Sequence, residues 1–280
     1  MVTYRPRTLE EALNLLQDIK TIPFAGGTDL MVKYRSWAGT LPQLQAPVLW
    51  LGEIKELKGI HQSGDTLVIG SMETLASILA SPAAPELLKY AIAQMASPSI
   101  RNMGTMGGNI CNASPAGDTL PPLYVLDASV LLRSSAGERT LPIAEFITGP
   151  GKTALRKDEL LTEIHIPIRE YNKRYYRKVG TRKANALSKL SMAGLADIRD
   201  GVIEDVRIAL GAVAPTVVRS IEAEKTLQGR NVKEIFAMIP EAITTYSELI
   251  TPIDDQRSNA AYRKTVSLRL IEDFLNHLAD

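Results

Sequence analysis

The stretch Phe24-Ala25-Gly26-Gly27-Thr28-Asp29-Leu30 follows a short apolar run, and the chain has a second stretch of the same kind at Thr105-Met106-Gly107-Gly108-Asn109. In both, a pair of glycines is followed by hydroxyl, amide or carboxylate side chains. Glycine lets backbone N–H groups approach an anion closely, and the polar side chains then fix its orientation. We therefore predict two loops that converge on one diphosphate. Neither stretch matches Gly-x-Gly-x-x-Gly, so a Rossmann dinucleotide turn is not predicted.

The residues around the first stretch predict a strand, a glycine loop and a helix. Thr8 and Glu11 form a capping-box pattern, and apolar residues at helical spacing follow, which predicts a helix from about Leu9 to Ile19. Residues 21–25 are expected to form the strand that leads into the loop, and residues 29–37 the helix that leaves it. This order is typical of phosphate-binding segments.

Apolar patterns predict further elements on both sides of a boundary near residues 171–176, where charged residues and tyrosines cluster. Asp118 precedes a proline-containing helical pattern that ends at Leu126, so it is a candidate helix cap. Asp200-Gly201 predicts the turn of a hairpin. The expected strands are residues 48–51, 66–69, 130–133, 161–166, 190–199 and 202–213, and the expected helices are residues 73–79, 86–95, 221–228, 232–246 and 258–278.

Composition excludes several classes of function. The chain has 280 residues, with 32 basic and 31 acidic residues and a net charge of +1, so neither nucleic acid nor an anionic membrane is expected as a partner. No apolar stretch is long enough to cross a bilayer and no signal core is present, which predicts a cytoplasmic location. The single cysteine, Cys111, and three scattered histidines predict no metal site and no iron–sulfur cluster on this chain. Cys111 itself is expected to be a small buried residue.

The chain resembles the FAD-binding subunits of the molybdenum hydroxylases, the family that includes xanthine dehydrogenase and aerobic carbon monoxide dehydrogenase. The resemblance rests on an ordered set of motifs along nearly the whole length. These are Ala25-Gly26-Gly27-Thr28-Asp29, Thr105-Met106-Gly107-Gly108-Asn109, Gly149-Pro150-Gly151-Lys152-Thr153, Glu159-Leu160-Leu161, Ile166-Pro167 and Arg177-Lys178-Val179-Gly180-Thr181-Arg182-Lys183. The run from Gly108 to Asp118 looks closest to the xanthine dehydrogenase branch.

The resemblance implies a set of residues that contact a non-covalent FAD. The first loop, Pro23 to Leu30, is expected at the diphosphate, and Thr105, Met106, Gly107, Gly108 and Asn109 at the flavin or diphosphate. Asp118 matches a position that reaches the cofactor, Leu161 one that packs beside it, and Lys178 one that places a cation near the flavin. The resemblance implies no catalytic acid or base and no metal on this chain.

The resemblance also implies the fold and the partners. The expected class is α+β. An FAD-binding domain like that of para-cresol methylhydroxylase spans residues 1–170, with subdomains of about 1–57 and 58–170, and a C-terminal domain with a small antiparallel sheet spans residues 171–280. A large subunit would carry molybdopterin and a small subunit the 2Fe–2S clusters. Electrons would pass through FAD to an acceptor such as NAD.

Three other interpretations are weighed against this one. The run Gly149-Pro150-Gly151-Lys152-Thr153 resembles the end of a nucleotide-binding P-loop, but Phe146 stands where that motif needs its first glycine. A self-contained flavin oxidase would often tether FAD through His or Cys, and neither glycine stretch contains a histidine. A scaffold that has lost its cofactor would not need the intact glycine pairs.

Overall fold

The computed structural model describes residues 2–38, 40–182 and 185–279, so Lys183 at the end of the last motif lies outside the described residues. The fold is α+β, as predicted, and the backbone divides into two compact units. The first unit comprises Met1–Ala84, Ser97–Ala113 and Ala128–Pro167. The second comprises Pro85–Ala96, Ser114–Asp127 and Ile168–Asp280. Within the described residues, no helix is long and apolar enough to cross a membrane.

A small parallel sheet at the start of the first unit holds the first glycine stretch. Its strands are β1 (Thr3–Tyr4), β3 (Val48–Trp50) and β2 (Ile22–Phe24), in that order across the sheet. Helix α1 (Leu9–Asp18) begins at Thr8, whose hydroxyl accepts the N–H of Glu11, as the capping-box pattern predicts. The buried face of α1 packs on the core that includes Leu49 and Leu51. The strand β2, which leads into the glycine stretch, is therefore held in place by its pairing with β3.

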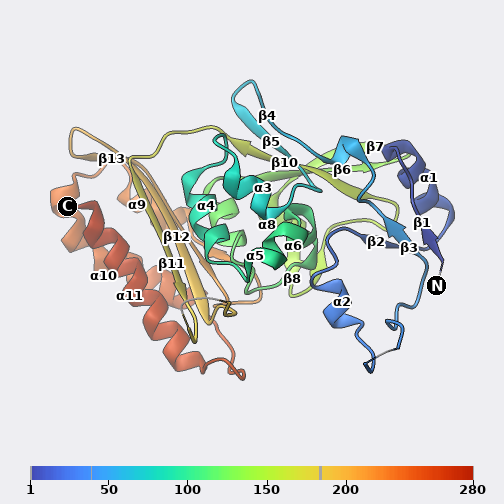
Figure 1. Ribbon diagram of the computed structural model, residues 1–280. Helices are drawn as coiled ribbons and strands as arrows, with labels where there is room; N and C mark the ends of the chain where they lie inside the picture. The colour runs from blue at the N-terminus through green and yellow to red at the C-terminus, as the bar shows by residue number, and fades with distance from the viewer. Residues whose placement is uncertain (1, 39, 183–184, 280) are drawn as a thin grey trace. The chain divides into compact units, whose positions relative to one another are not determined.

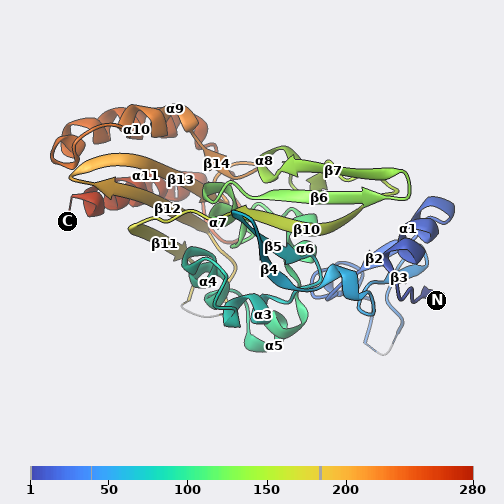
Figure 2. The same ribbon diagram turned by 90° about the horizontal axis from the view of Figure 1, so that it is seen from above.

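An antiparallel sheet forms the rest of the first unit (Figures 1 and 2). Its order is β4 (Ile60–Ser63), β5 (Thr66–Gly70), β10 (Leu160–Pro167), β6 (Ser129–Ser134) and β7 (Gly137–Pro142). Alternating burial along β10, the central strand, matches a strand that is covered on one face. The remaining elements are η1 (Lys55–Leu57), α3 (Leu75–Ala80), α5 (Pro98–Met103), α6 (Met106–Asn112), α8 (Ile143–Phe146), β8 (Ile147–Gly149) and β9 (Lys152–Thr153).

The second unit is built on another antiparallel sheet, β11 (Lys173–Val179), β12 (Leu190–Arg199), β13 (Val202–Gly211) and β14 (Val218–Arg219). The predicted hairpin turn is confirmed, because Asp200 and Gly201 both adopt positive φ between β12 and β13. Helices α9 (Ile221–Leu227), α10 (Ile235–Leu249) and α11 (Ala260–Leu278) cover one face, and α4 (Glu86–Ala93) and α7 (Leu120–Val125) pack on the other (Figures 1 and 2). A short helix, η2 (Val232–Glu234), precedes α10.

Helix α7 is fixed to this sheet by two arginines. All six of its residues are buried. Arg207 donates to the carbonyl of Val125 at 2.9 Å and Arg219 to that of Tyr124 at 2.6 Å. Both guanidinium groups also pair with the carboxylate of Asp127, just beyond the helix. The carbonyl groups at the end of α7 are thereby bonded to side chains of the sheet.

The predicted elements differ from the observed ones in two places near the site. The helix expected over residues 29–37 is only α2 (Leu30–Lys33), because the side chains that follow do not find a buried surface. The stretch expected as the second glycine loop contains α6, and the residues before it form α5, which the sequence reasoning missed. Two glycines in a seven-residue helix hide its pattern, since glycine contributes no apolar side chain to a periodicity.

Candidate functional site

The first glycine stretch is a tight turn between β2 and α2. Gly27 has φ +70°, and a Cβ atom there would overlap the ring of Phe24. A Cβ atom on Gly26 would overlap the carbonyl of Met103. Both positions therefore require glycine. Gly27 requires it mainly for its backbone conformation, and Gly26 requires it for close packing.

The backbone N–H groups of this turn are available to a ligand. In the part of the chain that the structure describes, those of Gly26, Gly27, Thr28 and Asp29 have no intramolecular hydrogen-bond partner. The amide of Met31, two residues after Asp29, bonds back to the carbonyl of Gly27 at 2.9 Å, inside the start of α2. A run of successive free N–H groups in a turn is a typical anion-binding arrangement. This observation supports the prediction of a phosphate-binding loop.

The second glycine stretch is the start of helix α6 and does not expose its amides. The side chain of Thr105 caps the helix by accepting the N–H of Gly108 at 3.1 Å. The N–H of Gly107 donates to the carbonyl of Ser71 at 2.9 Å, and that of Met106 to the carbonyl of Glu73 at 3.0 Å. The expectation of bare amide groups in a second loop is therefore wrong, because the cap and the chain after β5 occupy them.

The two glycines of α6 lie in different surroundings. Gly107 is buried, and a Cβ atom there would lie 2.7 Å from both Cβ and the carbonyl oxygen of Ser71. Gly108 is exposed, and its Cβ atom would lie 2.9 Å from Oγ1 of Thr105 and 3.8 Å from Cβ of Ala25. The structure thus brings α6 beside the first glycine turn. Gly107 allows the packing of α6, and Gly108 leaves an open backbone surface next to the turn.

Leu161 and Asn109 belong to the same unit. Leu161 is a buried residue of β10 that pairs in register with Leu132 of β6. The carbonyl of the next residue, Thr162, accepts the N–H of Ser71 at 2.9 Å, so Ser71 joins β10 to α6. Asn109 is half-buried and its N–H donates to the carbonyl of Thr105 at 3.0 Å. Sequence reasoning missed Ser71, since a serine after a strand carries no signal of its own.

Asp118 and Lys178 form a buried ion pair in the second unit. The Nζ atom of Lys178 lies 2.7 Å from Oδ2 of Asp118, and it also donates to the carbonyl of Gln94 at 2.9 Å. The hydroxyl of Ser188 donates to the other carboxylate oxygen. Asp118 therefore does not cap α7 with its side chain, as expected from sequence; Thr119 stands at that position. Ser188, a further residue that the sequence did not indicate, is fully buried.

Burial dominates the electrostatics of this pair. The loss of water raises the pKa of Asp118, although the nearby Lys178 ammonium and the Ser188 hydroxyl act in the opposite direction. Burial also raises the pKa of Tyr176 well above its ordinary value, with the charge of Asp118 adding to the effect. When the pKa of an acid is higher in the folded protein than in the unfolded one, the free energy of unfolding falls as pH rises from the unfolded pKa to the folded pKa. The ionised carboxylate of Asp118 therefore lowers the free energy of unfolding at neutral pH.

Cys111 lies in α6 and is half-buried, so the expectation of a buried residue is wrong. Burial raises its pKa to about 12, so the thiol is protonated at neutral pH. In the described residues, no group of three His, Cys, Asp or Glu side chains is placed to hold a metal ion.

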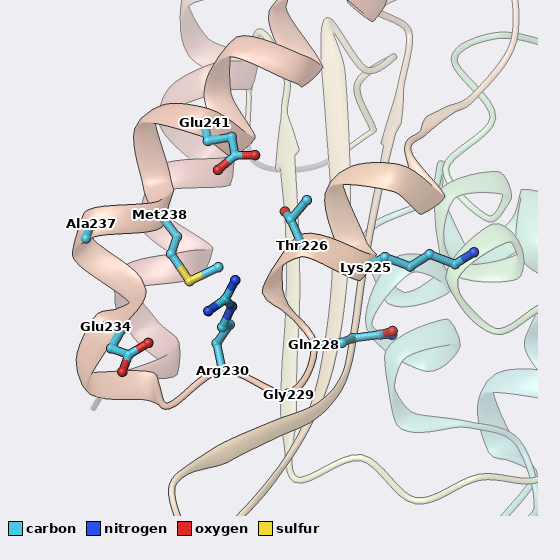
Figure 3. A pocket seen from close by; sticks show the side chains of 9 residues that line it. All are labelled: Lys225, Thr226, Gln228, Gly229, Arg230, Glu234, Ala237, Met238 and Glu241. Carbon is cyan, nitrogen blue, oxygen red and sulfur yellow. The ribbon is translucent and has the colours of Figure 1, made fainter.

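One hollow of about 740 Å³ lies in the second unit between α9 and α10 (Figure 3). The Arg230 side chain extends toward Met238 within it, and Glu241 points in from α10 (Figure 3). None of the site residues indicated by the sequence lines this hollow. We therefore assign the candidate site to the glycine turn with α6, and separately to the Asp118–Lys178 pair.

Comparison with known proteins identifies the family of the chain. Residues 1–169 match the family model of the FAD binding domain in molybdopterin dehydrogenase, and residues 174–278 match that of the CO dehydrogenase flavoprotein C-terminal domain. The chain is 31% identical over 268 residues to the glyceraldehyde dehydrogenase medium chain of Sulfolobus acidocaldarius, covering 94% of this chain and 92% of the relative. It is 33% identical over 232 residues to a putative xanthine dehydrogenase FAD-binding subunit of Escherichia coli, covering 80% of this chain and 78% of the relative.

A solved structure shares the fold. Carbon monoxide dehydrogenase from Hydrogenophaga pseudoflava, in a form that lacks the Mo-pyranopterin moiety, has a chain that superposes with a TM-score of 0.89 at 27% identity. The match covers 99% of this chain and 96% of that one. With both family models matched along nearly the whole length, the chain belongs to the FAD-binding subunits of the molybdenum hydroxylase family and carries an FAD-binding domain.

Proposed function

We propose that this chain binds one FAD non-covalently and passes electrons from 2Fe–2S clusters on a partner subunit to an acceptor such as NAD. A molybdopterin-binding large subunit would oxidise the organic substrate in the same complex. The proposed complex is xanthine dehydrogenase-like and works in the cytoplasm. We also propose a division of the chain into an FAD-binding part, residues 1–170 with subdomains of about 1–57 and 58–170, and a C-terminal part, residues 171–280.

The observation that carries the proposal is the row of free N–H groups from Gly26 to Asp29. A diphosphate fits this turn, because the amides are unpaired among the described residues. The proposed contact residues are Pro23, Phe24, Ala25, Gly26, Gly27, Thr28, Asp29, Leu30, Thr105, Met106, Gly107, Gly108, Asn109, Asp118, Leu161 and Lys178.

The residues have different proposed tasks. The amides from Gly26 to Asp29 would hold the diphosphate, and the exposed backbone of Gly108 would allow close approach. Lys178 would supply a fixed positive charge, since Asp118 and Gln94 already hold its Nζ atom in place. Bound FAD supplies the electron transfer, which side chains alone do not provide.

The relatives support a subunit role. Their names include a medium chain, an FAD-binding subunit and an FAD-subunit, for substrates as different as glyceraldehyde, xanthine and nicotinate. Similar flavin chains thus accompany different substrates, which is expected where the substrate binds elsewhere. The xanthine dehydrogenase-like assignment is supported by the 33% identity with the Escherichia coli relative.

The cofactor is tested by acid precipitation of the purified protein. We expect the supernatant to contain one equivalent of FAD per chain. Chromatography beside FAD and FMN standards identifies the flavin. Flavin that stays with the pellet would contradict non-covalent binding. Release of FMN would contradict the diphosphate assignment of the glycine turn.

The role of the chain is tested by comparing the isolated protein with the complete complex. The isolated chain should reduce dyes slowly with NADH and should not hydroxylate purines, whereas the complex should oxidise xanthine with NAD. Xanthine turnover by molybdenum-free isolated protein would support a self-contained oxidase. A complex that oxidises another substrate would leave the flavin role intact and overturn the xanthine assignment.

A further inference from the structure

Two aromatic side chains lie at the carboxyl edge of the small parallel sheet, where the glycine turn begins. Phe24 is the last residue of β2 and Trp50 is the last residue of β3, and the two pair in register. Their ring centroids are 5.5 Å apart, and the ring planes are tilted by 44°. In open α/β sheets, ligands bind outside the carboxyl ends of the parallel strands. The aromatic pair therefore lies at the edge where a parallel sheet holds a ligand.

The ring of Phe24 packs directly on the turn whose amides are free. A Cβ atom on Gly27 would overlap this ring, so the ring fills the space beside the backbone of Gly27. Gly27 itself belongs to the row of N–H groups, from Gly26 to Asp29, that have no partner in the described chain. A phosphate held by these amides would therefore lie close to the aromatic pair.

Trp50 is only partly covered by the protein. The two residues before it in β3 are buried, whereas Trp50 is half-buried, and so is Phe24. A Cβ atom on Gly52 would overlap the indole ring, so part of that ring packs on the backbone of Gly52. Among the described residues, the indole N–H of Trp50 has no hydrogen-bond partner. A half-exposed indole with a free donor suits a ligand that has both a flat ring and a polar edge.

The chemistry of the turn and of the two rings points to one kind of ligand. Free amides in a turn bind phosphate groups, and aromatic side chains stack on nucleobases. We propose that Trp50, together with Phe24, stacks on the adenine ring of FAD and so makes the site selective for FAD over FMN. The inference rests on the proposed function, in which Lys178 supplies the charge beside the flavin. The adenine is then the ring of FAD that is left for the aromatic pair.

The test compares four ligands that contain different parts of FAD. The full chain is freed of flavin by dialysis against bromide, and calorimetry measures the Kd values of FAD, ADP, FMN and pyrophosphate. ADP carries the adenine without the flavin, FMN carries the flavin without the adenine, and pyrophosphate carries neither. The variants are Trp50→Leu, which removes the aromatic ring, and Trp50→Phe, which keeps one. The matched control is Trp37→Leu, because Trp37 is the other tryptophan of the chain and is 85% exposed.

We expect Trp50→Leu to raise the Kd values of FAD and ADP at least about fivefold, because one base stack is lost, and to change those of FMN and pyrophosphate less than about twofold. Trp50→Phe should recover most of the lost affinity. The control should bind all four ligands as the wild type does. In Trp37→Leu, Trp50 is the sole tryptophan, so ADP should quench the tryptophan fluorescence and pyrophosphate should not. This measurement decides the question if Trp50→Leu does not fold.

Each of the other results overturns the inference. Unchanged Kd values for FAD and ADP in Trp50→Leu, or no quenching by ADP in Trp37→Leu, would show that no base stacks on Trp50. Equal losses for all four ligands would show that Trp50 only supports the turn. A loss for FMN without a loss for ADP would put the flavin ring at Trp50. Wild-type protein that binds no FAD would instead refute the proposed function, so the two failures are distinguishable.

Discussion

The two glycine stretches look alike in sequence but are built differently. The first leaves the amides from Gly26 to Asp29 without partners in the described chain, whereas the second turns into α6 and bonds its amides to Thr105, Ser71 and Glu73. In the first, glycine gives a turn that open amides can use. In the second, glycine gives close packing of a helix. A Gly-Gly pair therefore predicts tight geometry, and the surrounding partners decide whether that geometry serves a ligand or the fold.

The largest expected effect is on the stability of the fold, through the packing of Gly107 in α6. Gly107→Ala places a Cβ atom 2.7 Å from the backbone oxygen of Ser71, so α6 or the chain after β5 must shift. We expect a loss of about 2 kcal/mol in the free energy of unfolding, seen as a lower Tm of the FAD-free protein. Gly149→Ala is the matched control, because that buried glycine has its nearest neighbouring atom 3.9 Å away. Equal Tm values would show that α6 does not depend on Gly107 for packing.

Gly108→Val should affect binding more than folding. The residue is exposed, and branched bulk there covers the open backbone next to Ala25. We expect the Kd for FAD to rise about tenfold, equal to about 1.4 kcal/mol. The free energy of unfolding should fall by at most about 1 kcal/mol, because the added Cβ atom lies 2.9 Å from Oγ1 of Thr105, the cap of α6. Fluorescence titration with FAD measures the first and calorimetry the second. If Gly108→Val lowered Tm as much as Gly107→Ala, both glycines would serve packing and the contrast within α6 would fail.

A pair of threonines sharpens the comparison between the stretches. Thr105→Ala removes the cap of α6, so the free energy of unfolding should fall by about 1 kcal/mol while FAD affinity stays within about twofold. Thr28→Ala removes a hydroxyl from the open turn, so FAD affinity should fall about fivefold, the loss of one hydrogen bond of about 1 kcal/mol. Its Tm should be unchanged. The reverse pattern would exchange the roles that we assign to the two stretches.

The last prediction concerns the chemistry of α6. Because the pKa of the Cys111 thiol is raised to about 12, iodoacetamide at pH 8 should modify it roughly a thousandfold more slowly than an ordinary cysteine of pKa about 8.5. Mass spectrometry follows the modification, and protein unfolded in guanidinium is the control. FAD should not change the rate in the folded protein. Rapid labelling would mean that α6 opens far more readily than its internal bonds imply.

The sequence predicted the elements whose patterns are local. The cap at Thr8, the strand that ends at Phe24 and the turn at Asp200-Gly201 follow from adjacent residues, and the structure confirms each. The helical state of Gly107 and Gly108 was not predictable in this way, since it depends on Ser71 and Glu73 from another part of the chain.

The same reason explains the site residues. The free amides of the first turn follow from its own sequence, whereas the partner of Asp118 did not. Its carboxylate was expected as a local cap and instead pairs with Lys178 and Ser188, far along the chain. A sequence pattern shows which side chains are polar. It does not show which distant group removes them from water.

The interleaved composition of the two units has a consequence for synthesis of the protein. The second unit takes α4 and α7 from the N-terminal half of the chain, yet the sheet on which they pack begins only at Lys173. When a ribosome has made the first 170 residues, the six buried residues of α7 have α4 beside them but lack the sheet that covers them in the folded protein. In a nascent chain this apolar segment therefore stays partly exposed to solvent until β12 and β13 have been synthesised. A fragment that stops at residue 170 should accordingly bind chaperones.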